Sequence, residues 1–224
     1  MKLTISKEDY IKAIAEAEAD EGTVIAATIA RWLQVSPPAV ALALRRLRRD
    51  KMVTVDRKGA ILLTPEGRSI ADKLRLRHHL VERMLNELLG IEWYKVHDEA
   101  ERLEHAISAD VEERLIAMLG PSTRCPHGNE INKSAVDLRN QGLQLLWEAP
   151  PGTPVKIDCM YERDRKLLEY FDGLGIRPGV GATVQEQNYD GTLSLRLREK
   201  GRVGEKGIVL GEAAARRVWV SLDA

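Results

Sequence analysis

The segment KVHDEAERLEHAI carries two histidines and two glutamates at a spacing that suits metal binding. A helix turns by about 100° per residue, so the four side chains would lie within an arc of roughly 100°. These four residues are His97, Glu101, Glu104 and His105. In the upstream segment RHHLVERML, His78 and Glu82 are one helical turn apart. Neutral imidazole and carboxylate together suit a divalent transition metal, so the spacing predicts a metal-sensing face.

A helix this rich in charge is also compatible with a solvated surface, stabilised by pairs such as Asp98–Arg102. The distribution of histidine argues against that alternative, because four of the five histidines lie between positions 78 and 105. The fifth, His127, follows Cys125 in a weak thiolate–imidazole pair without the CxxC spacing of a zinc site. We interpret that pair as structural.

Composition indicates a globular protein of two or three small domains, with 224 residues, 44% hydrophobic and 30% charged. No apolar run approaches the ~18–20 residues of a membrane helix, and the N-terminus lacks the apolar core of a signal peptide. The two cysteines suit a reducing cytoplasm. We therefore expect a cytoplasmic protein with no membrane contact.

The formal net charge of zero conceals two oppositely charged regions. Residues 31–58 carry eight basic and two acidic side chains, whereas residues 84–114 carry nine acidic and three basic ones. The first region is suited to a polyanion and the second to cations.

Residues 1–73 are predicted to form a winged helix-turn-helix. Ser36-Pro37 is typical of an N-cap followed by proline at the first helical position, and that helix would run to about Asp50. Residues 52–55 and 60–64 would pair as a hairpin whose basic tip is the wing.

In such a fold the helix that starts at Ser36 enters the DNA major groove, and its early residues meet base edges. The candidates for base contacts are Ser36, Pro38, Ala39 and Leu42. Three of them are apolar, which favours contact with thymine methyl groups. The candidates for phosphate contacts are Arg45, Arg46, Arg49, Arg57 and Lys58.

The remainder divides into three parts. Residues 74–141 are predicted to be helical (74–89, 94–107 and 109–119), with surplus apolar side chains that indicate a homodimer. Residues 142–154 would form a stiff proline-rich linker. Residues 155–224 would form a small β-barrel from five short strands at 155–160, 182–187, 193–198, 207–210 and 218–221. The expected fold class is α+β.

The chain resembles, over nearly its full length, the diphtheria-toxin-repressor family of metal-dependent transcriptional regulators. The resemblance is carried by RHHLVERML, GIEWYKVHDEAERLEH and CPHGNEI, and by LLEYFDGLGIRPG, which is similar to the SH3-like domain shared with FeoA proteins. It implies a homodimer that binds double-stranded operator DNA when loaded with metal, usually as a repressor of metal-uptake genes.

The resemblance also implies two metal sites. The principal site would use Asp9, Glu101, Glu104 and His105. The second site would use His78, Glu82 and His97, with Asp164 as a candidate ligand from the SH3-like domain.

Departures from the iron-responsive members, which have methionine and cysteine in place of Asp9 and Glu101, favour Mn²⁺ as the activating ion, with Fe²⁺ as the alternative. Manganese-responsive members carry a glutamate where this chain has Lys12, which puts a dinuclear site in doubt. Leu42 replaces a base-contacting glutamine of iron-type members, so operator preference does not transfer.

Other classes remain open at this stage. A dimetal oxidase would need Glu-x-x-His repeats on two helices, and no activated nucleophile is evident, so we do not expect an enzyme. A metal-independent DNA-binding protein is a further alternative, and the SH3-like domain could bind a proline-rich segment such as residues 150–154 of this chain.

Overall fold

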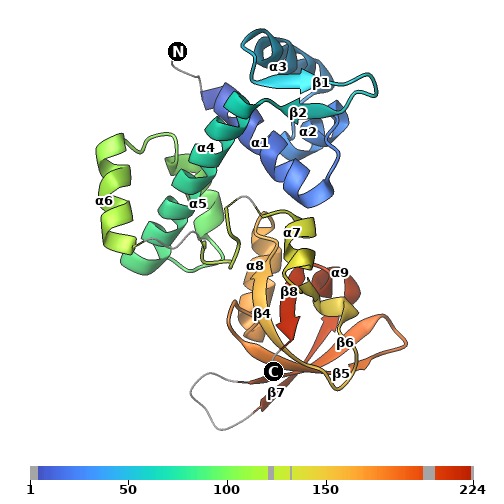
Figure 1. Ribbon diagram of the computed structural model, residues 1–224. Helices are drawn as coiled ribbons and strands as arrows, with labels where there is room; N and C mark the ends of the chain where they lie inside the picture. Colours follow the sequence, from blue (N-terminus) through green and yellow to red (C-terminus); the bar gives the residue numbers. More distant parts are fainter. Residues whose placement is uncertain (1–4, 121–123, 132, 199–204, 223–224) are drawn as a thin grey trace.

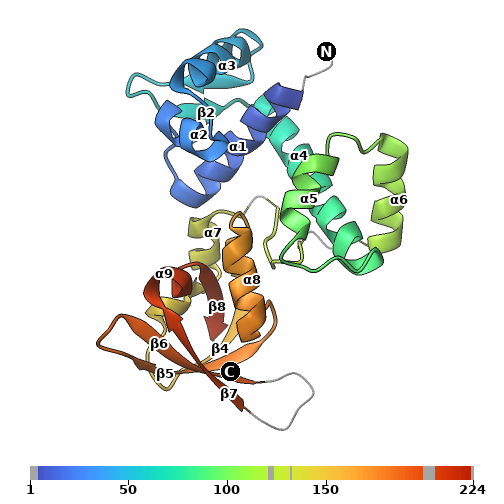
Figure 2. The ribbon, with the colours of Figure 1, turned by 180° about the vertical axis from the view of Figure 1, so that it is seen from behind.

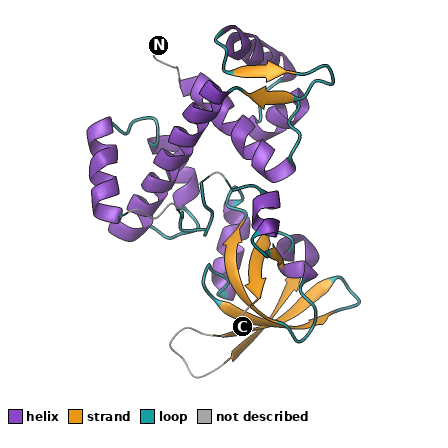
Figure 3. Cartoon of the chain, viewed as in Figure 1, coloured by secondary structure: helices purple, strands orange, loops and turns teal. Residues whose placement is uncertain are grey.

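The computed structural model describes residues 5–120, 124–131, 133–198 and 205–222. It shows three bodies: an N-terminal helical unit with a small hairpin, a second helical unit, and a C-terminal sheet with its own helices (Figures 1 and 3). The expected α+β fold class is confirmed.

The N-terminal unit is a winged helix-turn-helix, as the sequence predicts. Its helices are α1 (Ile5–Glu21), α2 (Ala26–Leu33) and α3 (Pro37–Arg49). The antiparallel strands β1 (Val53–Val55) and β2 (Ile61–Leu63) form the wing hairpin. Apolar side chains from all five elements form one core that includes Ile11, Ile14, Ile29, Val40, Leu47, Val53 and Ile61.

The face of α3 that is opposite this core is exposed and basic. Ser36 is the N-cap and proline fills the first helical turn, where its missing N–H costs no hydrogen bond. Leu42 is 41% exposed in the middle of the helix. At the wing, the Asp56 carboxylate accepts the backbone N–H groups of Lys58 and Ala60, which shapes a tight tip.

One long helix, α4 (Pro65–Arg83), connects the first two bodies (Figure 1). The Thr64 hydroxyl caps its N-terminus by accepting the Gly67 N–H. A side chain at Gly67 would meet the Met52 carbonyl at 2.1 Å, so glycine allows α4 to start directly against the wing. The boundary that we expected near residue 73 falls within this helix. Its last turn widens into the π-helical segment η1 (Met84–Leu88).

The second body is completed by α5 (Val96–Leu103) and α6 (Ala109–Leu119). The sequence predicts one helix over residues 94–107, but α5 ends earlier. Glu104 and His105 therefore lie in the turn after the helix rather than on its face.

The C-terminal body is an antiparallel sheet with strand order β3-β8-β4-β5-β6-β7. Register shifts in β4 and β5 bend the sheet around one apolar core. Its strands are β3 (Gln144–Leu145), β4 (Pro154–Met160), β5 (Gly181–Gln187), β6 (Thr192–Arg198), β7 (Glu205–Gly211) and β8 (Val218–Leu222). Its helical segments are α7 (Ala135–Asn140), η2 (Leu146–Glu148), α8 (Arg165–Leu174) and α9 (Glu212–Ala215).

The proline-rich linker predicted over residues 142–154 is wrong. This segment contains β3 and η2, and Leu146 and Ala149 are fully buried in the core of the sheet. Gly152 and Thr153 then form a turn that is hydrogen-bonded to Val184 of β5. The apolar side chains that precede the prolines account for the difference, because they bury more surface in the core than an extended linker would.

The apolar surplus of the second body is partly core and partly surface. Leu80 and Leu85 are buried within the chain, whereas Leu88 and Leu89 are exposed. Further exposed apolar residues lie on α6: Val111, Ile116 and Met118. Both views of the ribbon show α6 at the outer edge of the molecule (Figures 1 and 2). In the described part of the chain, no helix combines the length and apolarity needed to span a bilayer.

Candidate metal centre

Among the described residues, two groups place potential metal ligands within 4.8 Å of one another. One contains His78, His97 and Glu101. The other contains Glu82, Cys125, His127 and Glu162, and we call it the four-ligand cluster. The groups lie side by side, because His97 Nδ1 is 3.0 Å from His78 Nε2 and 3.1 Å from Glu82 Oε1.

The first group surrounds a buried ammonium. Lys12 Nζ, on α1, is 2.8 Å from Glu101 Oε1, 2.8 Å from both oxygens of Glu104 and 3.2 Å from His78 Nδ1. We call these four residues the lysine cluster. Burial alone would lower the pKa of Lys12, but the carboxylates of Glu16, Glu101 and Glu104 raise it above its ordinary value. The ammonium therefore stays charged and takes the position that a cation would occupy among these ligands.

Burial and the Lys12 charge together shift the pKa values of the neighbouring groups. Burial, followed by the Lys12 charge, holds the pKa of His78 well below its ordinary value. Burial outweighs the effect of Lys12 for Glu104 and raises its pKa to about 7. Burial also lowers the pKa of His97 to about 4. Both histidines are therefore neutral at physiological pH, which is the form that binds metal.

The predicted principal site is only partly assembled. His105 Nε2 lies 2.9 Å from Asp9 Oδ1 and 3.5 Å from Glu104 Oε1, and its Nδ1 is held 2.9 Å from the Glu8 carboxylate. Glu101 is turned toward Lys12 instead. All of these residues except Glu8 and Glu104 line a cavity of about 530 Å³ between α1 and α5.

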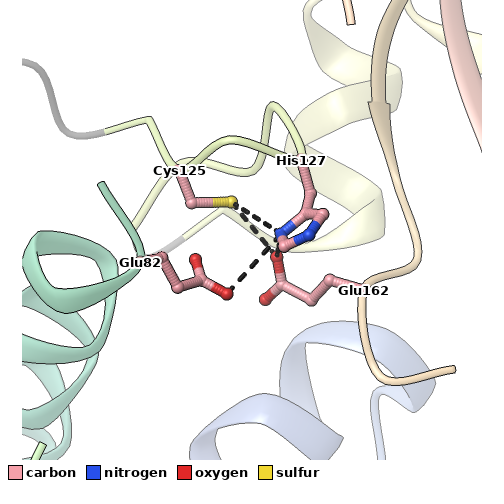
Figure 4. A group of neighbouring side chains, drawn as sticks. All are labelled: Glu82, Cys125, His127 and Glu162. Atoms are coloured by element: carbon pink, nitrogen blue, oxygen red, sulfur yellow. Dashed lines mark hydrogen bonds and ion pairs between the residues drawn. The ribbon is translucent and has the colours of Figure 1, made fainter. Parts of the chain in front are cut away.

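The four-ligand cluster draws its side chains from three segments (Figure 4). Glu82 comes from the end of α4, Cys125 and His127 from the loop before α7, and Glu162 from the connection between β4 and α8. His127 Nδ1 is 3.5 Å from Glu82 Oε1 and 3.4 Å from Glu162 Oε2. The Cys125 thiol donates a hydrogen bond of 3.1 Å to Glu162. The second and third bodies therefore meet at this cluster.

Two buried carboxylates that face each other dominate the electrostatics of the four-ligand cluster. Burial and the facing Glu162 carboxylate raise the pKa of Glu82 well above its usual range. Burial would also raise the pKa of Glu162, but its hydrogen bond with His127 and the nearby histidines hold it well below that range. Burial raises the pKa of the Cys125 thiol as well. Glu82 Oε2 is buried without a hydrogen-bond partner among the described residues.

The surroundings of His127 aim one ring nitrogen into the cluster. Its Nε2–H donates to the Trp93 carbonyl at 2.9 Å, which turns Nδ1 toward the carboxylates of Glu82 and Glu162. The following residue, Gly128, has φ of +86°, and a Cβ there would lie 2.1 Å from the Asp158 carbonyl. This close approach positions the loop against β4. Nitrogen, sulfur and two carboxylate donors with one unpaired oxygen fit a divalent transition metal.

The structure brings the three expected helical ligands of the second site together. His78 Nε2 lies 3.2 Å from Glu82 Oε1 and 3.0 Å from His97 Nδ1, and His97 Nδ1 lies 3.1 Å from Glu82 Oε1. Glu82 also belongs to the four-ligand cluster with Cys125, His127 and Glu162. Asp164 is not in either group, because its carboxylate caps α8 by accepting the Leu167 N–H at 3.1 Å. The ligand candidate from the C-terminal body is Glu162, two residues earlier, which corrects the expectation for Asp164.

Sequence reasoning missed Glu162 and treated Cys125 and His127 as a structural pair. A signal for Cys125 and His127 was present in CPHGNEI, where a thiol and an imidazole flank a proline before a glycine turn. No local spacing links that motif to Glu162, because the contact depends on how β4 is placed against the helices.

A basic winged helix-turn-helix joined to a helical unit with buried metal ligands defines a metal-responsive DNA-binding regulator. Family models match three consecutive parts of the chain. The N-terminal DNA-binding domain of iron-dependent repressors matches residues 2–61, and their metal-binding and dimerisation domain matches residues 64–133. The FeoA domain matches residues 145–222.

Relatives and solved structures agree with these matches. The diphtheria toxin repressor of Corynebacterium diphtheriae is 37% identical over 74% of this chain and 71% of that protein. The iron-dependent repressor IdeR of Mycobacterium leprae is 33% identical over 82% and 85%. A manganese-dependent transcriptional repressor in complex with manganese superposes with a TM-score of 0.84 at 29% identity, covering 97% of this chain and 100% of that one.

This chain belongs to the diphtheria toxin repressor family of metal-dependent transcriptional repressors. The family membership confirms the expected regulator rather than an enzyme, and it confirms operator DNA, a second copy of the chain and divalent metal as the partners.

Proposed function

We propose that this protein acts in the cytoplasm as a Mn²⁺-activated repressor that controls genes for metal uptake. The observation that carries the proposal is the contact between Asp9 of α1 and His105 beyond α5, at 2.9 Å. It joins the DNA-binding body to the metal-binding body at a cavity lined by ligands. A cation bound there would bridge the two bodies and fix the first helix.

We assign the first Mn²⁺ position to Asp9, Glu104 and His105, with Glu101 at its edge beside Lys12. Three carboxylates and one imidazole form a mainly oxygen donor set, which favours Mn²⁺ over softer ions. A similar structure is described as a manganese complex, whereas relatives are named iron-dependent. Fe²⁺ is therefore the alternative activator.

We assign a second divalent position to the four-ligand cluster. Its support is the unpaired Glu82 oxygen, the oriented His127 nitrogen and the thiol of Cys125. A metal there would neutralise two carboxylates that otherwise face each other. The thiolate makes this position more accepting of softer ions than the first one.

The DNA-binding surface that we propose is the exposed face of α3 and the wing. Ser36, Pro38, Ala39 and Leu42 lie at the start and middle of α3 and would meet base edges, although Ala39 is only half-exposed. Fully exposed basic residues beside them would contact phosphates: Arg45, Arg46, Arg49, Arg57 and Lys58. The exposed apolar surface of η1 and α6 would bury itself against a second copy and so place two α3 helices on two half-sites.

The decisive experiment measures binding of operator DNA with Mn²⁺, with Fe²⁺ under anaerobic conditions, and with a chelator. Strong binding with Mn²⁺ and none with the chelator is expected. To shift the ratio of active to inactive protein from 1:99 to 99:1, the metal must bind the active state more favourably by about 5.5 kcal/mol. Equal binding after complete demetallation would refute metal activation.

The Asp9 bridge is tested by Asp9→Ala. This variant should keep the fold, since Asp9 is half-exposed, but should need far more Mn²⁺ to bind DNA. Unchanged DNA binding at the same Mn²⁺ concentration would show that α1 is not fixed through this residue.

A further inference from the structure

Arg163 connects the C-terminal body to the DNA-binding body. It follows Glu162 directly in the connection between β4 and α8. The end of β4 points toward the N-terminal unit in the ribbon views (Figures 1 and 3). Whereas Glu162 contacts the ligands of the second body, Arg163 contacts the first.

Two contacts define the reach of Arg163. Its guanidinium forms an ion pair with Glu16 on α1, and it stacks over the Trp32 ring of α2 at 4.6 Å from the centroid. Both partners of the ion pair are largely buried, at 24% and 17% side-chain exposure. Arg163 therefore touches the two helices that support α3.

These partners are themselves fixed. Glu16 lies one helical turn beyond Lys12 on the same face of α1. Burial raises the pKa of the Glu16 carboxyl, and the charges of Lys12 and Arg163 oppose that rise. The Trp32 indole N–H donates to Glu21 at the end of α1, at 2.7 Å. A shift of Arg163 would therefore move α1 and α2 together.

The other side of the connection is equally tied to the cluster. The Asn129 amide donates to Glu162 at 2.6 Å and to the Met160 carbonyl at 2.9 Å. The Met160 N–H in turn donates to the His127 carbonyl at 3.1 Å. The backbone on the N-terminal side of Arg163 is thus held by the same loop that supplies Cys125 and His127.

We infer that Arg163 is a positioning residue that transmits metal occupation of the four-ligand cluster to the DNA-binding body. A cation at the cluster fixes Glu162, and the adjacent guanidinium then holds α1 and α2 in the DNA-binding arrangement. This route starts from a different metal position than the Asp9 bridge, and Arg163 also lines the cavity beside Asp9 and Glu101, so metal affinity at both positions is measured. The inference rests on the proposed second metal position. Such coupling requires that the two arrangements differ in their contacts, which the Glu16 and Trp32 contacts supply.

The test combines Arg163→Met with Cys125→Ala in a double-mutant cycle on the full chain. Mn²⁺ affinity at both positions and operator affinity at saturating Mn²⁺ are measured for each variant. Arg163→Met should leave cluster affinity within about threefold, but should weaken DNA binding by a factor within the 5–150-fold range typical of coupled sites. Both changes interrupt the same route. The operator affinity of the double variant should therefore be no lower than that of whichever single variant binds operator DNA less tightly.

Hydrogen exchange supplies a readout that does not depend on DNA. Mn²⁺ should slow exchange of α1 and α2 amides in the unmodified protein, and that slowing should be reduced in Arg163→Met. Arg165→Met is the matched control, since Arg165 is more exposed and its nearest acidic partner is Asp98, at 3.9 Å. Arg163→Lys retains the charge without the planar stack and should fall between the two.

The inference fails if Arg163→Met responds to metal as the unmodified protein does, or if the losses in the double variant multiply. These results differ from failure of the proposed function, in which the unmodified protein itself would show no response of DNA binding to metal.

Discussion

The lysine cluster and the four-ligand cluster are neighbours, and each holds carboxylates close together inside the protein. They differ in what compensates the negative charge. In the lysine cluster, the buried carboxylate of Glu104 and the partly exposed carboxylate of Glu101 contact an ammonium that the chain itself provides. In the four-ligand cluster, two carboxylates face each other, and one oxygen of Glu82 has no partner among the described residues. The lysine cluster therefore carries its own cation, whereas the four-ligand cluster gains most from an external one.

The largest expected effect tests whether Lys12 is a built-in cation. Lys12→Met should destabilise the metal-free protein by about 3–5 kcal/mol, because it leaves the buried Glu104 carboxylate without its ion-pair partner. Added Mn²⁺ should restore the melting temperature, and calorimetry should count an additional ion at His78, Glu101 and Glu104. Lys7→Met is the control, since its ion pair with Asp50 lies near the protein surface and should contribute far less to stability. A variant that is as stable as the unmodified protein without metal would contradict the comparison.

The second prediction removes a ligand from the other cluster. Cys125→Ala should lower metal affinity there by at least about 100-fold, since even supporting residues are worth 10–100-fold. Stability without metal should fall by only about 1 kcal/mol, because the thiol hydrogen bond to Glu162 is lost while the Asn129 amide still donates to that carboxylate. Cys159→Ala is a matched control, as Cys159 is a buried thiol of β4 outside both groups. Equal metal affinities for the two variants would mean that Cys125 does not bind the ion.

Supporting residues should separate the two proposed positions. Asn129→Ala removes a donor to Glu162 and should weaken the four-ligand cluster by about 10–100-fold. Glu8→Gln removes the carboxylate that orients His105 and should weaken only the Asp9 position by a similar factor. Parallel metal titrations measure both. If either change weakened metal binding equally at both positions, the Asp9 position and the four-ligand cluster would not be distinct sites.

The smallest expected effect is a difference in pH dependence. Metal binding displaces protons from ligands, so affinity rises with pH until the ligands are ionised. Because Glu104 has a pKa of about 7, affinity at the Asp9 position should level off above pH 7. The raised pKa of Cys125 should make affinity at the four-ligand cluster rise by about tenfold between pH 7 and 8. Calorimetry in buffers of different ionisation enthalpy would count the protons released, and equal release at both positions would be inconsistent with this account.

Local patterns predicted much of the fold. The proline at the start of α3 and the alternating strands of the C-terminal sheet matched the observed elements within one to two residues. Residues 142–154 were misinterpreted, because their prolines indicated a linker while Leu146 and Ala149 found places in the core. Amino-acid propensity indicates which local backbone conformation a segment prefers. Whether its side chains become buried depends on which part of the chain packs against them.

The sites were less accessible for the same reason. Helical spacing identified the histidines and glutamates but could not show that α5 ends at Leu103, which places Glu104 and His105 in a turn. It also could not show that Lys12, some 90 residues earlier, reaches between Glu101 and Glu104. Glu162 enters its cluster only through the docking of β4, which no spacing in the sequence encodes.

Anomalous scattering from crystals grown with Mn²⁺ tests the central claim most directly. We predict one ion beside Asp9 and His105, a second among Glu82, Cys125, His127 and Glu162, and the Lys12 ammonium still in place between Glu101 and Glu104. An ion bound in place of that ammonium, or no ion at the four-ligand cluster under saturating Mn²⁺, would contradict the account.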